Sequence, residues 1–317
     1  MTAATFDWSG QRVLVSGSGG VLGTALMAAL RQRAPAALIA PSRAECDLLD
    51  QPATFAMIMR VRPTMVFHLA GKVAGIGGNL AFAGEAFFEN AMMNINVIEG
   101  ARRAGVAKII AAGTTAIYSD RAALPMRETD IGVGMPHGSE AAYAAAKLGM
   151  LAQLEAYRKQ YGLPFAYLVC TNLYGANDRF DERYGHVVPS LISRFHRIME
   201  ERAAAITVWG DGTPTRDFLH SSDAAEAFIR CAERGEGVFN TATGNALPIH
   251  DLVEAIAAVS GFRGEIVWDT SKPNGQQERS YDITRISALG WQARLDLRAG
   301  IADTYRWFAR SATTVRR

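Results

Sequence analysis

Three side chains have the types and spacing needed for proton transfer to a carbonyl oxygen. The stretch GTTAIY places Thr114 and Thr115 at the end of an apolar run, and YAAAK places Tyr143 and Lys147 four residues apart. Residues four apart share one face of a helix, and a nearby ammonium lowers the pKa of a phenol. We therefore expect Tyr143 to exchange a proton with an oxygen that Thr114 also holds, while a nicotinamide transfers the hydride. Taken alone, the YxxxK spacing is also typical of a solvated helix face.

A glycine-rich turn near the N-terminus is typical of a dinucleotide site. In VLVSGSGGVLG, Gly17, Gly20 and Gly23 stand between an apolar run and a segment with helical spacing. Gly17 would permit a tight turn, Gly20 a close approach to a pyrophosphate, and Gly23 close packing of helix on strand. The helix N-terminus would face the phosphates. Ser18 and Val21 belong to the same expected cofactor loop.

The next apolar run ends in APSRAECD, and this segment indicates which dinucleotide binds. An acid at the end of this strand would bind the ribose 2′-hydroxyl of NAD. Ser42 and Arg43 come first here, and an arginine suits a 2′-phosphate. We therefore expect NADP(H), with NAD(H) as the alternative. Asp47 and Leu48 are expected to contact the adenine, although the same stretch could cap a helix.

The order of apolar runs indicates the fold class. Runs that are apolar throughout alternate with segments of helical spacing, which implies a parallel sheet covered on both faces. The sequence predicts an α/β fold, a Rossmann-type doubly wound parallel sheet with a smaller C-terminal lobe. Strands are expected at 37–43, 63–71, 108–115, 164–175 and 236–244, and helices near 90–104 and 141–160. The expected division is a dinucleotide-binding domain at 1–175 with a returning segment at about 219–246, a substrate lobe at 176–218 and 247–310, and a tail at 311–317.

The composition excludes several classes of protein. A formal net charge of +2 over 317 residues gives no reason to expect binding to nucleic acid or to an anionic membrane. No apolar run reaches the roughly 18 residues of a membrane span, and the first residues lack the apolar segment of a signal peptide. The three cysteines have no metal-ligand spacing, so we expect buried thiols, no metal and a cytoplasmic location.

Longer stretches resemble the GDP-L-fucose synthase branch of the extended short-chain dehydrogenase/reductases. They run in order through almost the whole chain, and TNLYG and VWGDGTPTRDFLH are the most specific. The resemblance implies an active-site triad of Thr114, Tyr143 and Lys147 and a homodimer built through the helices near 90–104 and 141–160. The other matching stretches are HLAGKVAGI, ENAMMNINVI, HVVPSLISRFH, TSKPNG and LGWQ.

The resemblance also implies which residues bind ligands. The substrate would be a GDP-linked 4-keto-6-deoxy sugar. For Trp209, the alternative to binding substrate is packing in the protein core. For Arg194, the alternative is a charge on the surface of a helix. The cofactor would lie against Ala70, Gly71, Lys147, Asn172, Leu173 and His186, and the substrate against Thr115, Asn172, Arg194, Trp209, Arg216 and Asn274.

The sequence departs from the family pattern at the position of an acid/base residue. The family epimerises its sugar with a cysteine three residues after the glycine of its GSSCIY stretch and with the histidine of HVxP. His186 is present, but Ala116 stands in the place of the cysteine. Alanine cannot take a proton, so we expect reduction at C4 without inversion at C3 or C5. The alternatives are complete GDP-L-fucose synthesis with a substitute base such as Cys170, a 4-epimerase with tightly bound NAD, and a non-catalytic dinucleotide sensor.

Three further departures concern ligand binding. Gly19 and Pro41 stand where family members carry arginines for the NADP phosphate. The expectation of NADP therefore depends on Ser42 and Arg43. Asn274 replaces an aspartate that contacts the substrate, so the recognised sugar or base is expected to differ from the usual one.

Overall fold

A six-stranded parallel sheet forms the centre of the protein. The computed structural model describes residues 6–272, 274 and 276–311. The spatial order of the strands is β10-β5-β4-β3-β1-β2, and every neighbouring pair is parallel. This is the Rossmann-type doubly wound arrangement that the sequence predicts. The strands are β1 (Arg12–Ser16), β2 (Ala37–Ile39), β3 (Met65–His68), β4 (Lys108–Thr114), β5 (Phe165–Cys170) and β10 (Gly237–Thr241).

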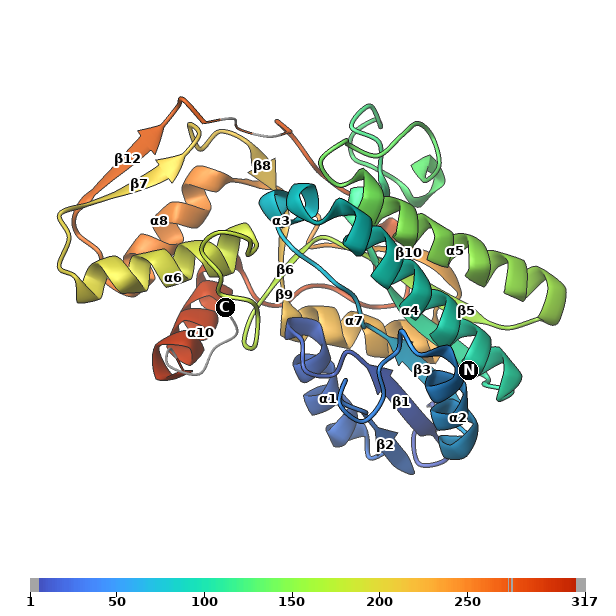
Figure 1. Ribbon diagram of the computed structural model, residues 1–317. Coiled ribbons are helices and arrows are strands. Elements are labelled where there is room, and N and C mark those ends of the chain that lie inside the picture. Colours follow the sequence, from blue (N-terminus) through green and yellow to red (C-terminus); the bar gives the residue numbers. More distant parts are fainter. Residues whose placement is uncertain (1–5, 273, 275, 312–317) are drawn as a thin grey trace.

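Helices cover both faces of this sheet (Figure 1). Leu26 and Phe228 belong to the apolar core on one face, and Ile98 and Met150 belong to the core on the other. Because both faces are buried, the strands are apolar throughout instead of alternating. The first face carries α1 (Val21–Arg33) and α7 (Ser221–Arg234), and the second carries α2 (Gln51–Val61), α4 (Ala83–Arg103) and α5 (Ala141–Tyr161).

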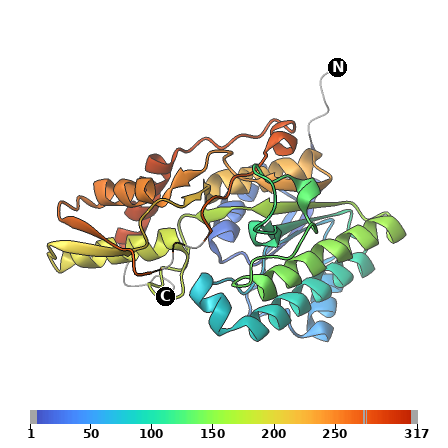
Figure 2. The same cartoon turned by 90° about the horizontal axis from the view of Figure 1, so that it is seen from above.

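A smaller lobe with its own apolar core lies beside the sheet (Figure 2). Phe195, Ile256 and Phe308 meet in that core. The residue boundaries between the sheet domain and this lobe stay a prediction from the sequence. The lobe contains α6 (Val187–Glu200), α8 (Ile249–Ser260), α10 (Leu297–Ser311) and the parallel pair β7 (Ala205–Trp209) and β12 (Glu265–Asp269).

Short elements connect these parts and correct two expectations. The strand expected at 37–43 ends at Ile39, and the one expected at 164–175 is two strands in different sheets. The chain leaves the central sheet at Thr171, whose hydroxyl donates to the Asp217 carbonyl at 3.0 Å. The short elements are β6 (Asn172–Tyr174) paired with β9 (Phe218–His220), β8 (Thr215–Arg216) paired with β11 (Leu247–Pro248), α3 (Ile76–Ala81), α9 (Thr284–Ser287) and the 3₁₀ turns Thr115–Ile117 and Glu128–Asp130.

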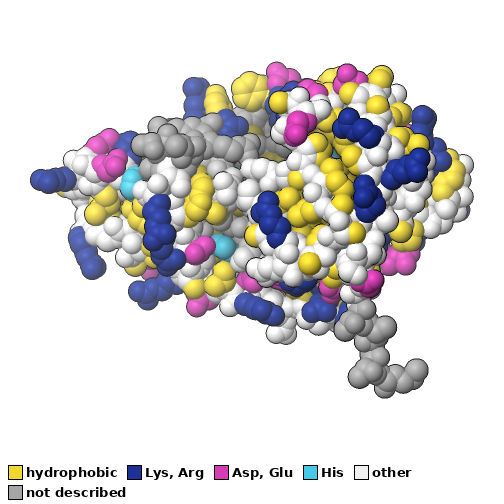
Figure 3. Space-filling model, turned by 90° about the horizontal axis from the view of Figure 1, so that it is seen from below, with side chains coloured by type: hydrophobic (Ala, Val, Ile, Leu, Met, Phe, Trp, Pro, Cys, Tyr) yellow, Lys and Arg dark blue, Asp and Glu magenta, His cyan; other side chains and the backbone are white. Residues whose placement is uncertain are grey.

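Charge and cysteine placement agree with the composition. On the face in Figure 3, Lys and Arg side chains are scattered among Asp and Glu. All three cysteines are buried. Among the described residues, no helix is long and apolar enough to cross a membrane, and no cluster of three metal-binding side chains occurs. Of the expected tail, Ser311 is the last residue of α10, and 312–317 lie outside the described residues.

Candidate active site

The glycine loop after β1 is shaped for close backbone contact. Gly17 has a φ of +73°, and a Cβ there would lie 2.6 Å from the Ala70 amide nitrogen. A Cβ on Gly23 would lie 2.1 Å from the Gly17 carbonyl oxygen. Gly20, the N-cap of α1, offers no side chain to the first amides of the helix. These amides are therefore available to a phosphate group, as the dinucleotide interpretation requires.

The loop opens into a cavity of about 870 Å³ at the carboxyl ends of β1, β3, β4 and β5. Ligands of open α/β sheets bind at these ends. The cavity brings together every residue expected to bind the cofactor and all four expected catalytic residues. These residues are Gly17, Ser18, Gly20, Val21, Gly23, Ser42, Arg43, Asp47, Leu48, Ala70, Gly71, Thr114, Tyr143, Lys147, Asn172, Leu173 and His186.

The end of the cavity beside β2 carries both positive and negative charge. The exposed Arg43 guanidinium pairs with Asp47 at 3.3 Å. The Ser42 amide and hydroxyl both donate to the Glu45 carboxylate, at 2.7 and 2.8 Å. Both groups are thus paired with an acid, but the Arg43 pair is long and its guanidinium is exposed, so Arg43 is the one that can turn toward a 2′-phosphate.

Buried contacts fix the catalytic side chains at the other end of the cavity. Tyr143 and Lys147 lie in the first two turns of α5, and both are buried. The Lys147 ammonium donates to the Ala112 carbonyl at 2.8 Å, which ties α5 to β4. Thr114 ends β4, and its hydroxyl accepts from the Ala116 amide at 3.2 Å. Strand β4 and helix α5 thus hold the three groups at one wall.

The expected lowering of the Tyr143 pKa is wrong. Burial raises the pKa of the Tyr143 phenol above its usual range, and the nearby Cys170 and Glu140 raise it further. The Lys147 ammonium lies 6.0 Å from the centre of the Tyr143 ring, and burial lowers its own pKa to about 8. Desolvation is the largest cause of the shift on both groups, and it opposes charge on each. Tyr143 is therefore a neutral phenol, suited to donating a proton.

Ala116, Cys170 and His186 share this cavity. Ala116 is buried and has no polar side-chain atom. The Cys170 thiol donates to the Leu168 carbonyl at 3.4 Å, and burial raises its pKa to about 12. Burial lowers the pKa of His186, although the charge of Glu140 partly opposes this. Cys170 thus reaches the site as a neutral thiol, which is a poor base.

The expected substrate residues do not all meet in the cavity. Arg194 donates to the Thr207 carbonyl, and Asn274 accepts from the Asp211 amide at 3.0 Å. Trp209 is 67% exposed, so it is not a core residue, and the Lys272 ammonium lies 5.9 Å from its ring. Arg216 is mostly buried, and its pKa is lowered by burial and by Arg279. Of the side chains expected to bind substrate only, Thr115 is the one that lines the cavity.

Several charged residues of the cavity were not predicted from the sequence, and two of them form a buried pair beside Tyr143. The Arg279 guanidinium is almost fully buried and pairs with the Glu140 carboxylate at 3.5 Å. Glu140 precedes Tyr143 by three residues, so the helical spacing of α5 could have indicated it. Arg279 lies in the stretch QQERSY, which carries no motif. Arg279 gives the cavity a buried positive charge suited to a diphosphate, and Arg216, outside the cavity lining, is near enough for the charge of Arg279 to lower its pKa.

Comparison with a family model identifies the family of the chain. The model described as the NAD dependent epimerase/dehydratase family matches residues 13–242. The chain belongs to this family. Among curated members, the GDP-L-fucose synthase of Escherichia coli (strain K12) is 36% identical over 311 residues, covering 95% of this chain and 97% of that protein. The GDP-L-fucose synthase of Sinorhizobium fredii (strain NBRC 101917 / NGR234) is 35% identical over 301 residues, covering 94% and 96%. The resemblance seen in the sequence is thus confirmed.

Solved structures of related proteins have the same fold. A GDP-6-OMe-4-keto-L-xylo-heptose reductase from C. jejuni superposes with a TM-score of 0.89 at 26% identity, covering 96% of this chain and 99% of that chain. A GDP-mannoheptose C4 reductase from Campylobacter jejuni with NADP bound gives 0.87 at 28%, covering 95% and 99%. A GDP-L-fucose synthetase from Naegleria fowleri bound to NADP gives 0.89 at 27%, covering 98% and 96%. The extended architecture of this epimerase/dehydratase family therefore holds for the chain.

Proposed function

We propose that this protein reduces the 4-keto group of a GDP-linked sugar with NADPH and does not invert C3 or C5. The observation that carries the proposal is the single cavity in which the glycine loop, Thr114, Tyr143 and Lys147 meet while Ala116 offers no base. Relatives named GDP-L-fucose synthase and GDP-mannoheptose C4 reductase support the substrate class. A 4-keto-6-deoxy sugar, or a related one, is the expected substrate.

Several polar groups of the site act in the reduction. When bound, NADPH supplies the hydride. Tyr143, a neutral phenol whose pKa burial raises further, donates its proton to the oxygen that becomes the C4 hydroxyl. Thr114 holds the same oxygen through its hydroxyl, and the Lys147 ammonium stabilises the negative charge left on the phenol. Arg216 and Arg279 bind the diphosphate, and His186 contacts the sugar.

The cofactor residues fit NADP(H). The uncapped amides of α1 suit the pyrophosphate, and Gly17 and Gly23 leave no room for a Cβ. Arg43 supplies the charge for the 2′-phosphate. NADP in two structural neighbours supports this choice. We further propose a cytoplasmic homodimer that uses no metal.

One observation favours complete GDP-L-fucose synthesis as the second candidate. The Glu140 carboxylate lines the cavity and acts on the pKa of both His186 and Tyr143. A carboxylate in this position could take a proton from the carbon beside the ketone, provided that it leaves its partner Arg279. Glu140, instead of Cys170, is therefore the substitute base to test.

The deciding experiment is incubation with GDP-4-keto-6-deoxy-mannose and NADPH in deuterated water, with the product identified by NMR. We expect reduction at C4, unchanged configuration at C3 and C5, and no deuterium at either carbon above an enzyme-free control. Rapid deuterium uptake at both carbons would favour the fucose synthase. Loss of this uptake in Glu140→Gln would identify Glu140 as the base. NAD retained through purification, with no net reduction, would favour the 4-epimerase instead.

A further inference from the structure

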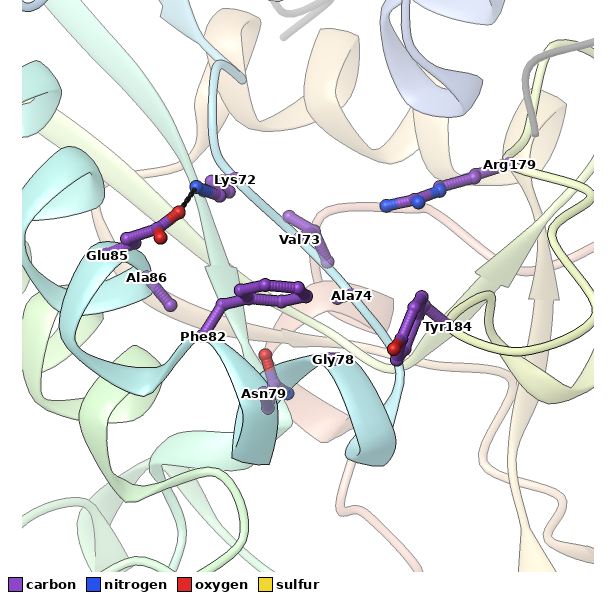
Figure 4. A pocket seen from close by; sticks show the side chains of 10 residues that line it. All are labelled: Lys72, Val73, Ala74, Gly78, Asn79, Phe82, Glu85, Ala86, Arg179 and Tyr184. Atoms are coloured by element: carbon purple, nitrogen blue, oxygen red, sulfur yellow. Dashed lines mark hydrogen bonds and ion pairs between the residues drawn. The ribbon is translucent and has the colours of Figure 1, made fainter.

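A second, smaller cavity opens beside the active site (Figure 4). It has a volume of about 210 Å³ and lies between α3, the start of α4 and the loop before α6. Five residues line both cavities, so the two spaces share a wall. The shared residues are Lys72, Val73, Ala74, Asn79 and Arg179. We call the smaller space the side pocket.

The side pocket contains hydrogen-bonding groups that the protein leaves unused. Asn79 is only 7% exposed, and its side-chain amide makes no hydrogen bond within the part of the chain that the structure describes, although its polar atoms are not among the fully buried ones without a partner. The Arg179 Nε is buried and also has no partner there, although the other end of the guanidinium pairs with Asp181 at 2.7 Å. A buried polar atom without a partner, such as the Arg179 Nε, is unfavourable. A ligand that accepts from Arg179 and bonds to the Asn79 amide would remove this penalty.

The charges of the side pocket favour a neutral ligand. Lys72 is paired with Glu85 at 2.5 Å and with Glu89 at 2.8 Å, and Arg179 is paired with Asp181. Each cation thus has at least one carboxylate of its own. An anionic group would have to displace an existing ion pair, whereas a hydroxyl needs only the free donors and acceptors.

Aromatic rings form another part of the side pocket. Phe82 and Tyr184 meet edge to face with their ring centres 5.8 Å apart. Figure 4 shows both rings beside Asn79 and Gly78. Ring faces pack well against C–H groups, while the amide and guanidinium bind hydroxyls. A carbon chain that carries hydroxyl groups offers both kinds of contact.

We propose that the side pocket binds a neutral, hydroxylated carbon arm on C5 of the keto sugar. This inference rests on the proposed function. With C4 at Tyr143, the ring substituents nearest to C4 are the C3 hydroxyl and the arm on C5. A single water-sized group needs only about 10–15 Å³ of such space, so the methyl arm of a 6-deoxy sugar would leave the side pocket almost empty. The structure thus indicates a preference for sugars with a longer, hydroxylated arm.

The test compares two substrates: GDP-4-keto-6-deoxy-mannose, and a GDP-4-keto sugar whose C5 arm has two carbons and two hydroxyls. We expect the wild type to give a kcat/KM about tenfold or more in favour of the longer arm. Asn79→Leu and Arg179→Met should each reduce this ratio about tenfold. Leu80→Ala is the matched control, because Leu80 is an exposed neighbour in α3 that does not line the side pocket. It should leave the ratio unchanged.

A binding measurement separates this inference from the proposed reduction. Calorimetry with GDP-mannose and a GDP-heptose, neither of which has a keto group, should show tighter binding of the heptose to the wild type. Asn79→Leu should remove that difference. If the wild type prefers the six-carbon sugar in both measurements, or if the variants weaken both sugars equally, the inference is overturned. If the heptose preference is present but no keto sugar is reduced, the proposed function fails and the side-pocket inference stands.

Discussion

At the scale of single residues, the reduction depends most on the Tyr143 hydroxyl. Tyr143→Phe removes the proton donor and leaves the ring in place, so we expect kcat to fall by about 10²–10⁴-fold. NADPH affinity should change little, as measured by fluorescence titration. Tyr157→Phe is the matched control, because Tyr157 lies on the same helix and bonds to Glu99, away from the cavity. Turnover near that of the wild type in Tyr143→Phe would remove this residue from the mechanism.

The lowered pKa of Lys147 predicts that the activity falls at alkaline pH. Burial lowers the pKa of its ammonium to about 8, so the group is charged below pH 8 and neutral above it. The neutral amine cannot stabilise a phenolate. We expect kcat/KM for reduction to be constant below about pH 7.5 and to fall about tenfold per pH unit above pH 8. A flat profile from pH 7 to pH 9.5 would show that the charge of Lys147 has no part in the reaction.

Cofactor choice is expected to depend on Arg43 and Glu45. Arg43→Ala removes the charged donor for the 2′-phosphate and should lower the preference for NADPH over NADH about tenfold or more. Glu45→Gln should raise that preference, since it removes a negative charge beside Ser42. The ratio of kcat/KM for the two cofactors measures both effects. A wild type that prefers NADH would contradict the NADP assignment.

The sequence could indicate Tyr143 and Lys147 because a fixed spacing on a helix puts both on one face. It could not give the direction of the Tyr143 pKa, since that depends on how completely the folded chain removes the phenol from water. Arg279 is missed for a similar reason. It lies in an irregular segment, and only the folded chain brings it to Glu140.

At the scale of elements, one contact joins the α3 loop to the loop that carries His186. The Gly75 amide donates to the Tyr184 carbonyl at 2.8 Å, and a Cβ on Gly75 would lie 2.5 Å from the Gly185 carbonyl oxygen. Gly75→Ala must push these loops apart, so we expect kcat to fall about tenfold or more while the fold is retained. Gly77→Ala is the control, because its Cβ would meet nothing closer than 3.6 Å.

Circular dichroism and NADPH binding would check that both glycine variants fold. Equal activity of the two variants would mean that the loop contact does not position His186.

Helix α3 itself was not predicted, because its glycines hide the helical pattern. The six sheet strands, in contrast, could be predicted from their short, mainly apolar runs. The split between β5 and β6 could not, since β6 pairs with a strand more than forty residues later in the chain.

At the scale of the whole molecule, α4 presents an apolar surface. Phe88 and Ile95 are seven residues apart on this helix, and they are 59% and 45% exposed. Exposed apolar surface of this kind marks contacts between proteins. We expect a dimer in sedimentation analysis and a monomer after Phe88→Glu. Val133→Glu, at an exposed residue of a turn outside α4, should remain dimeric. A monomeric wild type at micromolar concentration would contradict the homodimer.

The position of β10 has a consequence for how the protein is made. Strand β5 ends at Cys170, but its neighbour β10 ends only at Thr241, 71 residues later (241 − 170). At about 5–20 residues per second, a ribosome needs roughly 4–14 s to synthesise this interval. Until then, one edge of β5 has no partner strand, and its run FAYLVC is a template for pairing with other nascent chains. Release of the chain at residue 175 would make that exposure permanent, so such a fragment should aggregate unless a chaperone holds it.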